Sequence, residues 1–211
     1  MAITPKVIAV VNPKGGCGKT TLSTSLAAWL VYEAEVGMID MDVQQSSAEW
    51  LAFRSVHNPQ IMLHTLRALN NQSEMLNKFD YLIVDAPAGI QDKTLQKLLR
   101  QCDKLLVPLL PSPIDMRAGW QFLQNLFELK KNLKSQTKIG LIANRTRQHT
   151  LMYRELTGFI EQFRAPFVGH LRDSVNYMRA MEVGLGVTEL PPYQCRVDIE
   201  QWQPVIDWVK C

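Results

Sequence analysis

The residues best suited to chemistry form a glycine-rich segment, NPKGGCGKTT at positions 12–21. Its glycines leave backbone N–H groups unobstructed, so that several of them can converge on one anion. Lys19 stands where an ammonium reaches the β- and γ-phosphates of a nucleotide, and Thr20 where a hydroxyl reaches Mg²⁺. The segment predicts a phosphate-binding loop, and a glycine-rich turn without a ligand is the alternative.

Acidic residues follow two further apolar runs. Asp40 and Asp42 alternate along the chain, so on an extended segment their carboxylates face the same way. In YLIVD, at 81–85, four mostly apolar residues end in Asp85. Acids at the ends of buried strands can hold Mg²⁺-bound water or orient the water that attacks a phosphate. The alternative for Asp42 is a cap on a helix that starts near Ser46, because Asp is a preferred cap residue.

These residues need a scaffold that gathers the ends of several strands. Apolar runs predict strands at 6–11, 36–39, 61–65, 80–84, 104–110, 138–143 and 166–169. Helical spacing predicts helices near 19–33, 45–55, 67–77, 92–101, 115–133, 148–163, 174–183 and 198–210. This alternation predicts an α/β fold with a doubly wound, mostly parallel sheet of about seven or eight strands flanked by helices. Ligands of such sheets lie at the carboxyl ends of the strands, where the loop and the acids fall.

Composition narrows the class of protein. The chain is 46% hydrophobic and 20% charged, which is ordinary for a globular protein. No long linker, repeat or low-complexity tract divides it, so residues 1–211 are expected to form a single domain. Its four cysteines lack CxxC or CxxH spacing, which argues against a zinc site and fits a reducing cytosol. The apolar run before the loop is too short for a signal peptide or a membrane span.

One departure from the general phosphate-loop pattern GxxxxGK[ST] is informative. Pro13 replaces the first glycine, and the motif present is KGGxGKT, with an additional lysine at Lys14. With this motif the chain resembles the ParA/MinD family of deviant Walker A P-loop ATPases. The resemblance implies ATP and Mg²⁺ as cofactors, weak basal ATP hydrolysis, and a homodimer formed with ATP. In that dimer Lys14 would reach the phosphates held by the other subunit; a surface lysine that contacts its own nucleotide or water is the alternative.

The resemblance also implies the roles of single residues. The catalytic ones would be Lys14, Lys19 and Asp42, with Asp42 orienting the attacking water. Mg²⁺ would be held with the help of Thr20, Asp40 and Asp85. The nucleotide would be bound by Gly15, Gly16, Cys17, Gly18, Lys19, Thr20, Thr21 and Asn144.

Two of the loops that follow strands remain open to two interpretations. Asn144, in IANRT, stands where the family contacts the adenine, and a turn-forming asparagine is the alternative. Gly89, in DAPAGI, would let its loop approach the γ-phosphate and respond to its loss. Pro87 and Gly89 are equally typical of a plain turn.

Positive charge is concentrated in residues 130–147, which hold six of the 23 basic residues and none of the 20 acidic ones. A solvated helix end with a loop is one interpretation, and an anion-binding surface is the other. The resemblance favours the second, because ParA-like members bind nucleoid DNA non-specifically as ATP dimers. The candidate DNA contacts are Lys138, Arg145, Arg147, Arg172 and Arg179.

The C-terminal segment DIEQWQPVIDWVKC separates branches of the family. It carries an apolar stripe at helical spacing, but its polar side holds Asp198, Glu200 and Asp207 against Lys210 alone. An anionic membrane would repel this side, so a helix docked on the core is expected and membrane binding is not.

The sequence therefore predicts a cytoplasmic, nucleoid-associated ATPase of the short ParA type. A ParB-like or other cargo adaptor would stimulate it to segregate or position a plasmid, a chromosome or a protein body such as a carboxysome. A MinD-like membrane-associated switch and a metabolic P-loop ligase are the alternatives.

Overall fold

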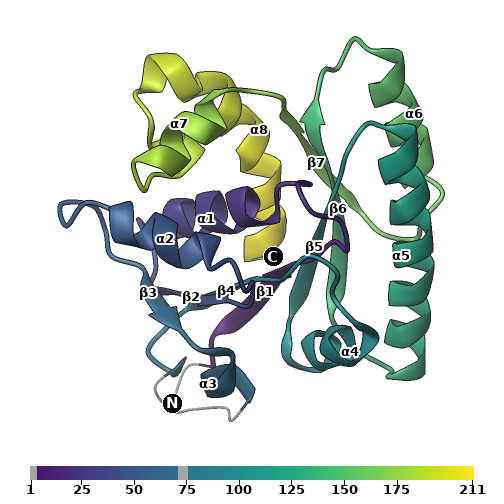
Figure 1. Ribbon diagram of the computed structural model, residues 1–211, viewed down its shortest axis with the longest axis horizontal. Coiled ribbons are helices and arrows are strands. Elements are labelled where there is room, and N and C mark those ends of the chain that lie inside the picture. The colour runs from purple at the N-terminus through teal and green to yellow at the C-terminus, as the bar shows by residue number, and fades with distance from the viewer. Residues whose placement is uncertain (1–3, 71–75) are drawn as a thin grey trace.

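Seven parallel strands form the central sheet of the computed structural model, which describes residues 4–70 and 76–211 (Figure 1). The strands are β1 (Lys6–Val10), β2 (Val36–Asp40), β3 (Met62–His64), β4 (Tyr81–Asp85), β5 (Lys104–Leu109), β6 (Lys138–Thr146) and β7 (Phe167–Arg172). Their order across the sheet is β3-β2-β4-β1-β5-β6-β7, and every neighbouring pair is parallel. The predicted fold class is confirmed.

Helices cover both faces of the sheet. They are α1 (Lys19–Leu30), α2 (Ser46–Phe53), α3 (Leu66–Asn70), α4 (Asp92–Gln101), α5 (Pro113–Asn132), α6 (Leu151–Ile160), α7 (Asn176–Glu182), the 3-10 helix η2 (Val187–Glu189) and α8 (Pro192–Lys210). Helices α3 to α6 pack on one face, and α1, α2 and α8 on the other. Alternate residues of a strand face opposite cores, as Val7 and Ile8 do, because side chains alternate across a sheet.

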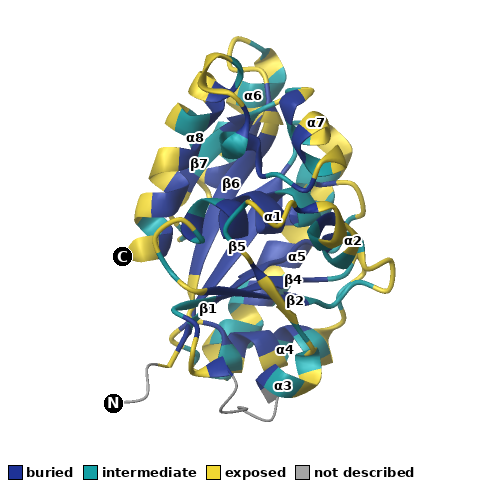
Figure 2. Cartoon of the chain, turned by 90° about the vertical axis from the view of Figure 1, so that its left-hand side faces the viewer, coloured by how far each residue is buried: buried dark blue, intermediate teal, exposed yellow. Residues whose placement is uncertain are grey.

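Burial on both faces explains the continuous apolar runs of the sequence. Figure 2 shows the strands as a buried layer between helices whose outer sides are exposed. The sequential connections reverse direction beside β1: β2 and β3 lie on one side of it, and β5 to β7 on the other. A ligand site is expected at the carboxyl end of β1, where this reversal occurs.

Several element boundaries differ from the sequence prediction. Helix α8 begins at Pro192 instead of 198, because proline fits the first turn of a helix, where its missing N–H is not needed. Strand β6 runs to Thr146 and so includes Asn144. The helix predicted at 67–77 corresponds to α3 over Leu66–Asn70, and positions 71–75 lie outside the described residues.

Helix α8 docks on the core, as its apolar stripe predicted. Trp202, Val205, Ile206 and Val209 are fully buried. The last turn is held by lysines from the sheet, since Lys104 Nζ donates to the Val209 carbonyl at 3.0 Å and Lys6 Nζ to the Lys210 carbonyl at 2.8 Å. Cations at a helix carboxyl end also stabilise its dipole.

Burial, and then the neighbouring charges of Lys6 and Lys138, lower the pKa of Lys104 to about 8. In the described part of the chain, no helix combines the length and the apolar character needed to cross a bilayer.

Candidate nucleotide-binding site

The loop between β1 and α1 has the form of an anion site. Gly16 and Gly18 adopt φ values of 75° and 93°, which favour glycine, and a Cβ at Gly15 or Gly16 would meet nothing within 4 Å. Lys19 opens α1 with only 6% of its surface exposed. Its ammonium turns back into the loop and donates to the Lys14 carbonyl at 2.9 Å. The loop, the helix N-terminus and this ammonium therefore converge, as phosphate binding requires.

Two buried asparagines support this loop, Asn12 from the segment just after β1 and Asn144 from β6. Asn12 donates to the Pro108 carbonyl at 2.7 Å and accepts from the Lys14 N–H at 2.8 Å. Asn144 donates to the Cys17 carbonyl at 2.8 Å. A Cβ at Gly18 would lie 2.4 Å from the Asn144 amide nitrogen, so this approach requires glycine. The sequence analysis missed Asn12, whereas Asn144, expected at the adenine, contacts the phosphate loop itself.

The additional lysine is paired with an acid from another element. Lys14 Nζ lies 2.6 Å from an Asp115 carboxylate oxygen in the first turn of α5. The Lys14 and Asp115 side chains are 35% and 19% exposed. Burial raises the pKa of Asp115, but the hydrogen bonds from Lys14 and Ser112 outweigh it and hold the pKa below its usual value. The sequence analysis did not identify Asp115 as a partner of Lys14.

Two of the predicted magnesium residues stand side by side. Asp40 and Asp85 are register partners at the carboxyl ends of β2 and β4. Asp85 is 1% exposed and accepts hydrogen bonds from Ser47 at 2.7 Å and Ser23 at 3.3 Å. Burial raises the pKa of Asp85, whereas hydrogen bonds from the hydroxyls of Ser47, Thr20 and Ser23 lower it. The hydroxyl of Thr20, in the first turn of α1, thus lies near the Asp85 carboxylate beside the loop.

Helix α2 is capped by Asp40, not by Asp42. One Asp40 oxygen accepts the N–H groups of Ser47 and Ala48 at 2.9 and 3.1 Å, and the other accepts that of Asp42 at 2.9 Å. Asp42 accepts the Gln44 N–H at 3.0 Å in the loop before the helix. The capping role therefore belongs to the acid two residues earlier in the chain, and Asp42 is half-buried in the loop after β2.

The loop after β4 is joined to the phosphate loop. The Gly89 N–H donates to the Pro13 carbonyl at 2.7 Å, and the φ of Gly89 is 66°. Glycine is favoured here because other residues rarely adopt this left-handed conformation. This hydrogen bond links the two loops directly.

A cavity of about 450 Å³ lies beside the phosphate loop. It is lined by Gly18, Thr21, Asn144, Arg145, Arg172, Asp173, Ser174, Val175, Tyr177, Met178, Met181 and Glu182. This volume lies in the range of small-molecule sites. The open glycines, the buried Lys19 and the hydroxyl–carboxylate pair fit a nucleotide with Mg²⁺, and the cavity offers room for the base and the sugar.

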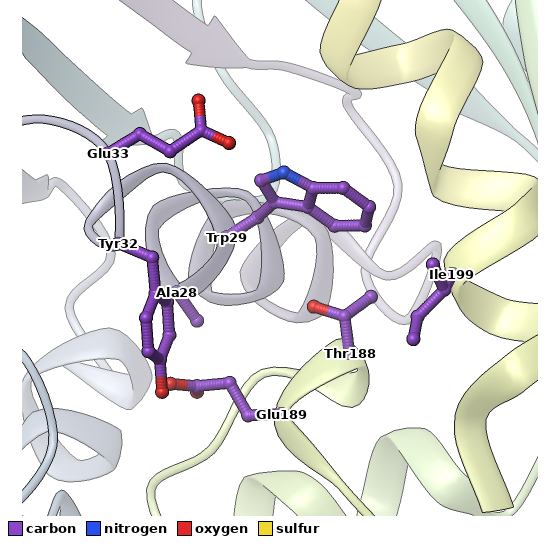
Figure 3. A pocket seen from close by; sticks show the side chains of 7 residues that line it. All are labelled: Ala28, Trp29, Tyr32, Glu33, Thr188, Glu189 and Ile199. Atoms are coloured by element: carbon purple, nitrogen blue, oxygen red, sulfur yellow. The ribbon is translucent and has the colours of Figure 1, made fainter. Parts of the chain in front are cut away.

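A second cavity, of about 360 Å³, lies among α1, η2 and α8 (Figure 3). Its two carboxylates are already engaged. Glu189 is bound by the Arg54 guanidinium at 2.7 and 2.9 Å, and Glu33 pairs with Lys210. Its lining includes Ala28, near the carboxyl end of α1, and Tyr32 and Glu33 in the turn that follows, far from Lys19, so we assign it no part in nucleotide binding.

The structure divides the basic window between the amino and the carboxyl ends of the strands, which lie on opposite sides of the molecule. Lys138 opens β6, whereas Arg145 lies near its carboxyl end and Arg147 just beyond it. The nine residues of β6 span roughly 30 Å at about 3.3 Å per residue, so Lys138 does not share a surface with the arginines.

The arginines themselves have different surroundings. Arg145 and Arg172 line the cavity beside the phosphate loop. Arg172 is also held by the fully buried Asp198 through two bonds of 2.7 and 2.8 Å, so Asp198 does not lie on the exposed side of α8, where the sequence analysis placed it. Arg147 pairs with Asp173 at the surface, and Arg179 is exposed on α7.

Comparison with known proteins agrees with this geometry. Residues 8–187 match the model of the CobQ/CobB/MinD/ParA nucleotide binding domain. The chain is 30% identical to the maintenance of carboxysome distribution protein A of Halothiobacillus neapolitanus over 188 residues, which cover 87% of each chain.

Solved structures show the same fold. An ATP complex of a Cyanothece McdA variant superposes with a TM-score of 0.77 at 20% identity, covering 99% of this chain and 96% of that one. The cell division protein MinD of Aquifex aeolicus superposes with a TM-score of 0.74 at 18% identity, covering 97% and 95%.

Proposed function

Because the chain belongs to the CobQ/CobB/MinD/ParA nucleotide-binding family, we propose that it is a ParA-type ATPase. It binds ATP with Mg²⁺, pairs with a second copy across the two nucleotides, and in that state binds nucleoid DNA without sequence preference. Hydrolysis then releases the pair. The observation that carries the proposal is Lys14, which belongs to the phosphate loop and whose ammonium is bound, among the described residues, by the partly exposed carboxylate of Asp115.

The residues at the carboxyl edge have separate tasks in this reaction. The loop N–H groups and Lys19 bind the phosphates, and Thr20, Asp40 and Asp85 hold Mg²⁺ directly or through water. When bound, Mg²⁺ neutralises charge on the phosphate oxygens. Asp42 orients the attacking water from its half-exposed position after β2. Preorganised charges of this kind supply most of what phosphoryl transfer requires.

Exposed apolar side chains support pairing through this same edge. Val43, next to Asp42, is 90% exposed, and Ile114, next to Asp115, is 74% exposed. Apolar side chains around a charged site are typical of a surface that another protein covers. Covering it would also exclude water and strengthen the attraction between Lys14 and the partner's phosphates.

The relatives support a positioning role. The Halothiobacillus relative is named for carboxysome distribution, and a Rhizobium radiobacter relative is named ParA. We therefore propose a cytoplasmic, nucleoid-associated protein whose cargo is a plasmid, a chromosome region or a protein body such as a carboxysome. A ParB-like or other adaptor on the cargo stimulates hydrolysis, and turnover is slow without it. A MinD-like membrane switch is disfavoured, because the apolar stripe of α8 is buried against the sheet.

Substituting Lys14→Ala tests the proposal. ATP affinity is expected to stay within about threefold, because Lys19 and the loop remain, whereas ATP-dependent dimers are expected to disappear in size-exclusion chromatography with light scattering. Lys138→Ala removes an exposed lysine at the opposite edge and serves as the control. If Lys14→Ala still dimerises with ATP, the contact across the pair is wrong; if the parent protein does not bind ATP, the proposed function fails altogether.

A further inference from the structure

Asp40 and Asp85 present two carboxylates at neighbouring strand ends. Paired strands lie about 4.8 Å apart, so two acids in register are close, and Asp85 is almost completely buried. Two ionised carboxylates in such a place repel each other, and hydrogen bonds from neighbouring groups offset part of this cost. The structure supplies a residue that contacts both.

Ser47 bridges the two acids. Its N–H donates to one Asp40 oxygen at 2.9 Å, and its hydroxyl donates to one Asp85 oxygen at 2.7 Å. The Ser47 side chain is completely buried. Ser47 therefore contacts one carboxylate on each of two adjacent strands, alongside the Ala48 N–H on Asp40 and the Ser23 hydroxyl on Asp85.

The helix that carries Ser47 is itself fixed at its other end. Trp50 donates its indole N–H to the Leu185 carbonyl at 3.0 Å, and Arg54 binds Glu189 and the Gly184 carbonyl. The Arg54 and Glu189 side chains are 1% and 5% exposed, so this ion pair is buried. Because α2 is anchored, Ser47 cannot shift without disturbing several buried contacts, and groups held this way keep their geometry when a ligand arrives.

We propose that Ser47 is a positioning residue of the magnesium site, its hydroxyl acting through Asp85 without contacting the nucleotide. This inference rests on the proposed function. Partners that orient the carboxylates around a metal typically change metal affinity or activity 10- to 100-fold when removed. Ser47 is thus expected to set the Mg²⁺ concentration at which nucleotide binds tightly.

The test measures binding of a fluorescent ATP analogue as Mg²⁺ is titrated, and again in EDTA. For Ser47→Ala we expect the Mg²⁺ concentration at half-maximal tight binding to rise about tenfold or more, with unchanged affinity in EDTA. Ser47→Thr keeps a hydroxyl and is expected to remain within about threefold of the parent. Ser46→Ala is the matched control, because successive helix residues point about 100° apart and its hydroxyl belongs to the same helical turn.

Each outcome decides the proposal. An unchanged Mg²⁺ titration in Ser47→Ala, or an equal loss in EDTA and in Mg²⁺, overturns it. If circular dichroism shows that Ser47→Ala is unfolded, Ser47→Cys replaces it, because a thiol is a weak donor of similar size. A parent protein that binds no ATP analogue would reject the proposed function instead, so the two failures are distinguishable.

Discussion

The Lys14 ammonium has two possible partners at the carboxyl ends of the strands, a carboxylate and a phosphate, and it cannot bind both at once. In the single chain its ammonium is bound to Asp115, whereas the proposed dimer needs it at the neighbour's phosphates. The ion pair is partly exposed, and pairs of this kind are worth at most about 1 kcal/mol. A weak contact of this strength keeps the lysine ordered without preventing its transfer to a triphosphate.

Replacing Asp115→Asn is expected to lower the ATP concentration needed for half-maximal dimerisation by severalfold, since a competing partner of Lys14 is weakened. The midpoint of thermal unfolding should change by no more than about 4 °C. Light scattering over an ATP titration measures the first quantity and calorimetry the second. Asp92→Asn, in the first turn of α4, is the control. A higher ATP requirement in Asp115→Asn would mean that the carboxylate helps the dimer form.

The sequence alone predicted the positions of residues that belong to short local motifs. The phosphate loop, Asp40 and Asp85 all stand at the sheet edge where the pattern predicts them. Asp115 could not be assigned in the same way, because it lies 101 positions from Lys14 and only the fold brings them together. Ser47 and Asn12 act through hydrogen bonds to neighbouring elements, which a residue type alone does not reveal.

Among the helices, α8 shows both a feature that the sequence predicted, its docking on the core, and one that it did not, the contacts of its last turn. Its apolar stripe predicted docking, and the structure confirms it. Its start was placed too late, although Pro191 and Pro192 are a recognisable signal for a first helical turn. The contacts of its last turn with Lys6 and Lys104 span 204 and 105 positions of sequence, which no local pattern reports.

Lys104 makes the stability of this docking depend on pH. Its pKa is about 8 in the folded protein against 10.5 in its ordinary state, so between these values the unfolded chain binds more protons than the folded one. Stability therefore rises as pH increases through this range, by at most about 1.4 kcal/mol per pH unit. Urea unfolding of the parent and of Lys104→Met should show the difference in unfolding free energy increasing from pH 7.5 to 9.5. A constant or decreasing difference would contradict this assignment.

Over the whole molecule, the nucleotide site and the exposed arginines share one side, and part of the basic window lies on the other. The count of basic residues suggested one anion-binding stretch, but β6 carries its two ends to opposite edges of the sheet. The concentration of basic residues along the sequence therefore identified only part of the proposed DNA-binding surface. Of the five candidate DNA contacts, Arg147 and Arg179 are the exposed side chains outside the cavity wall on the proposed DNA side.

This arrangement predicts how DNA binding responds to substitution. With ATP and Mg²⁺, the double variant Arg147→Ala with Arg179→Ala should bind duplex DNA at least about tenfold more weakly, and its affinity should depend less steeply on salt. Lys138→Ala should bind like the parent, since its side chain lies at the opposite edge. Electrophoretic mobility shifts at two salt concentrations make the measurement. Weakened binding by Lys138→Ala alone would move the DNA surface to the other end of the sheet.

The hydrogen bond from Lys6 to the last turn of α8 has a practical consequence. It places the last turn of α8 beside the first residue of β1, whereas the phosphate loop follows the other end of that strand. A dye, an affinity handle or a glass surface attached there is separated from the nucleotide by the length of β1, about 16 Å for its five residues. Single molecules can therefore be immobilised through this part of the surface while the face that exchanges ATP stays open to solution.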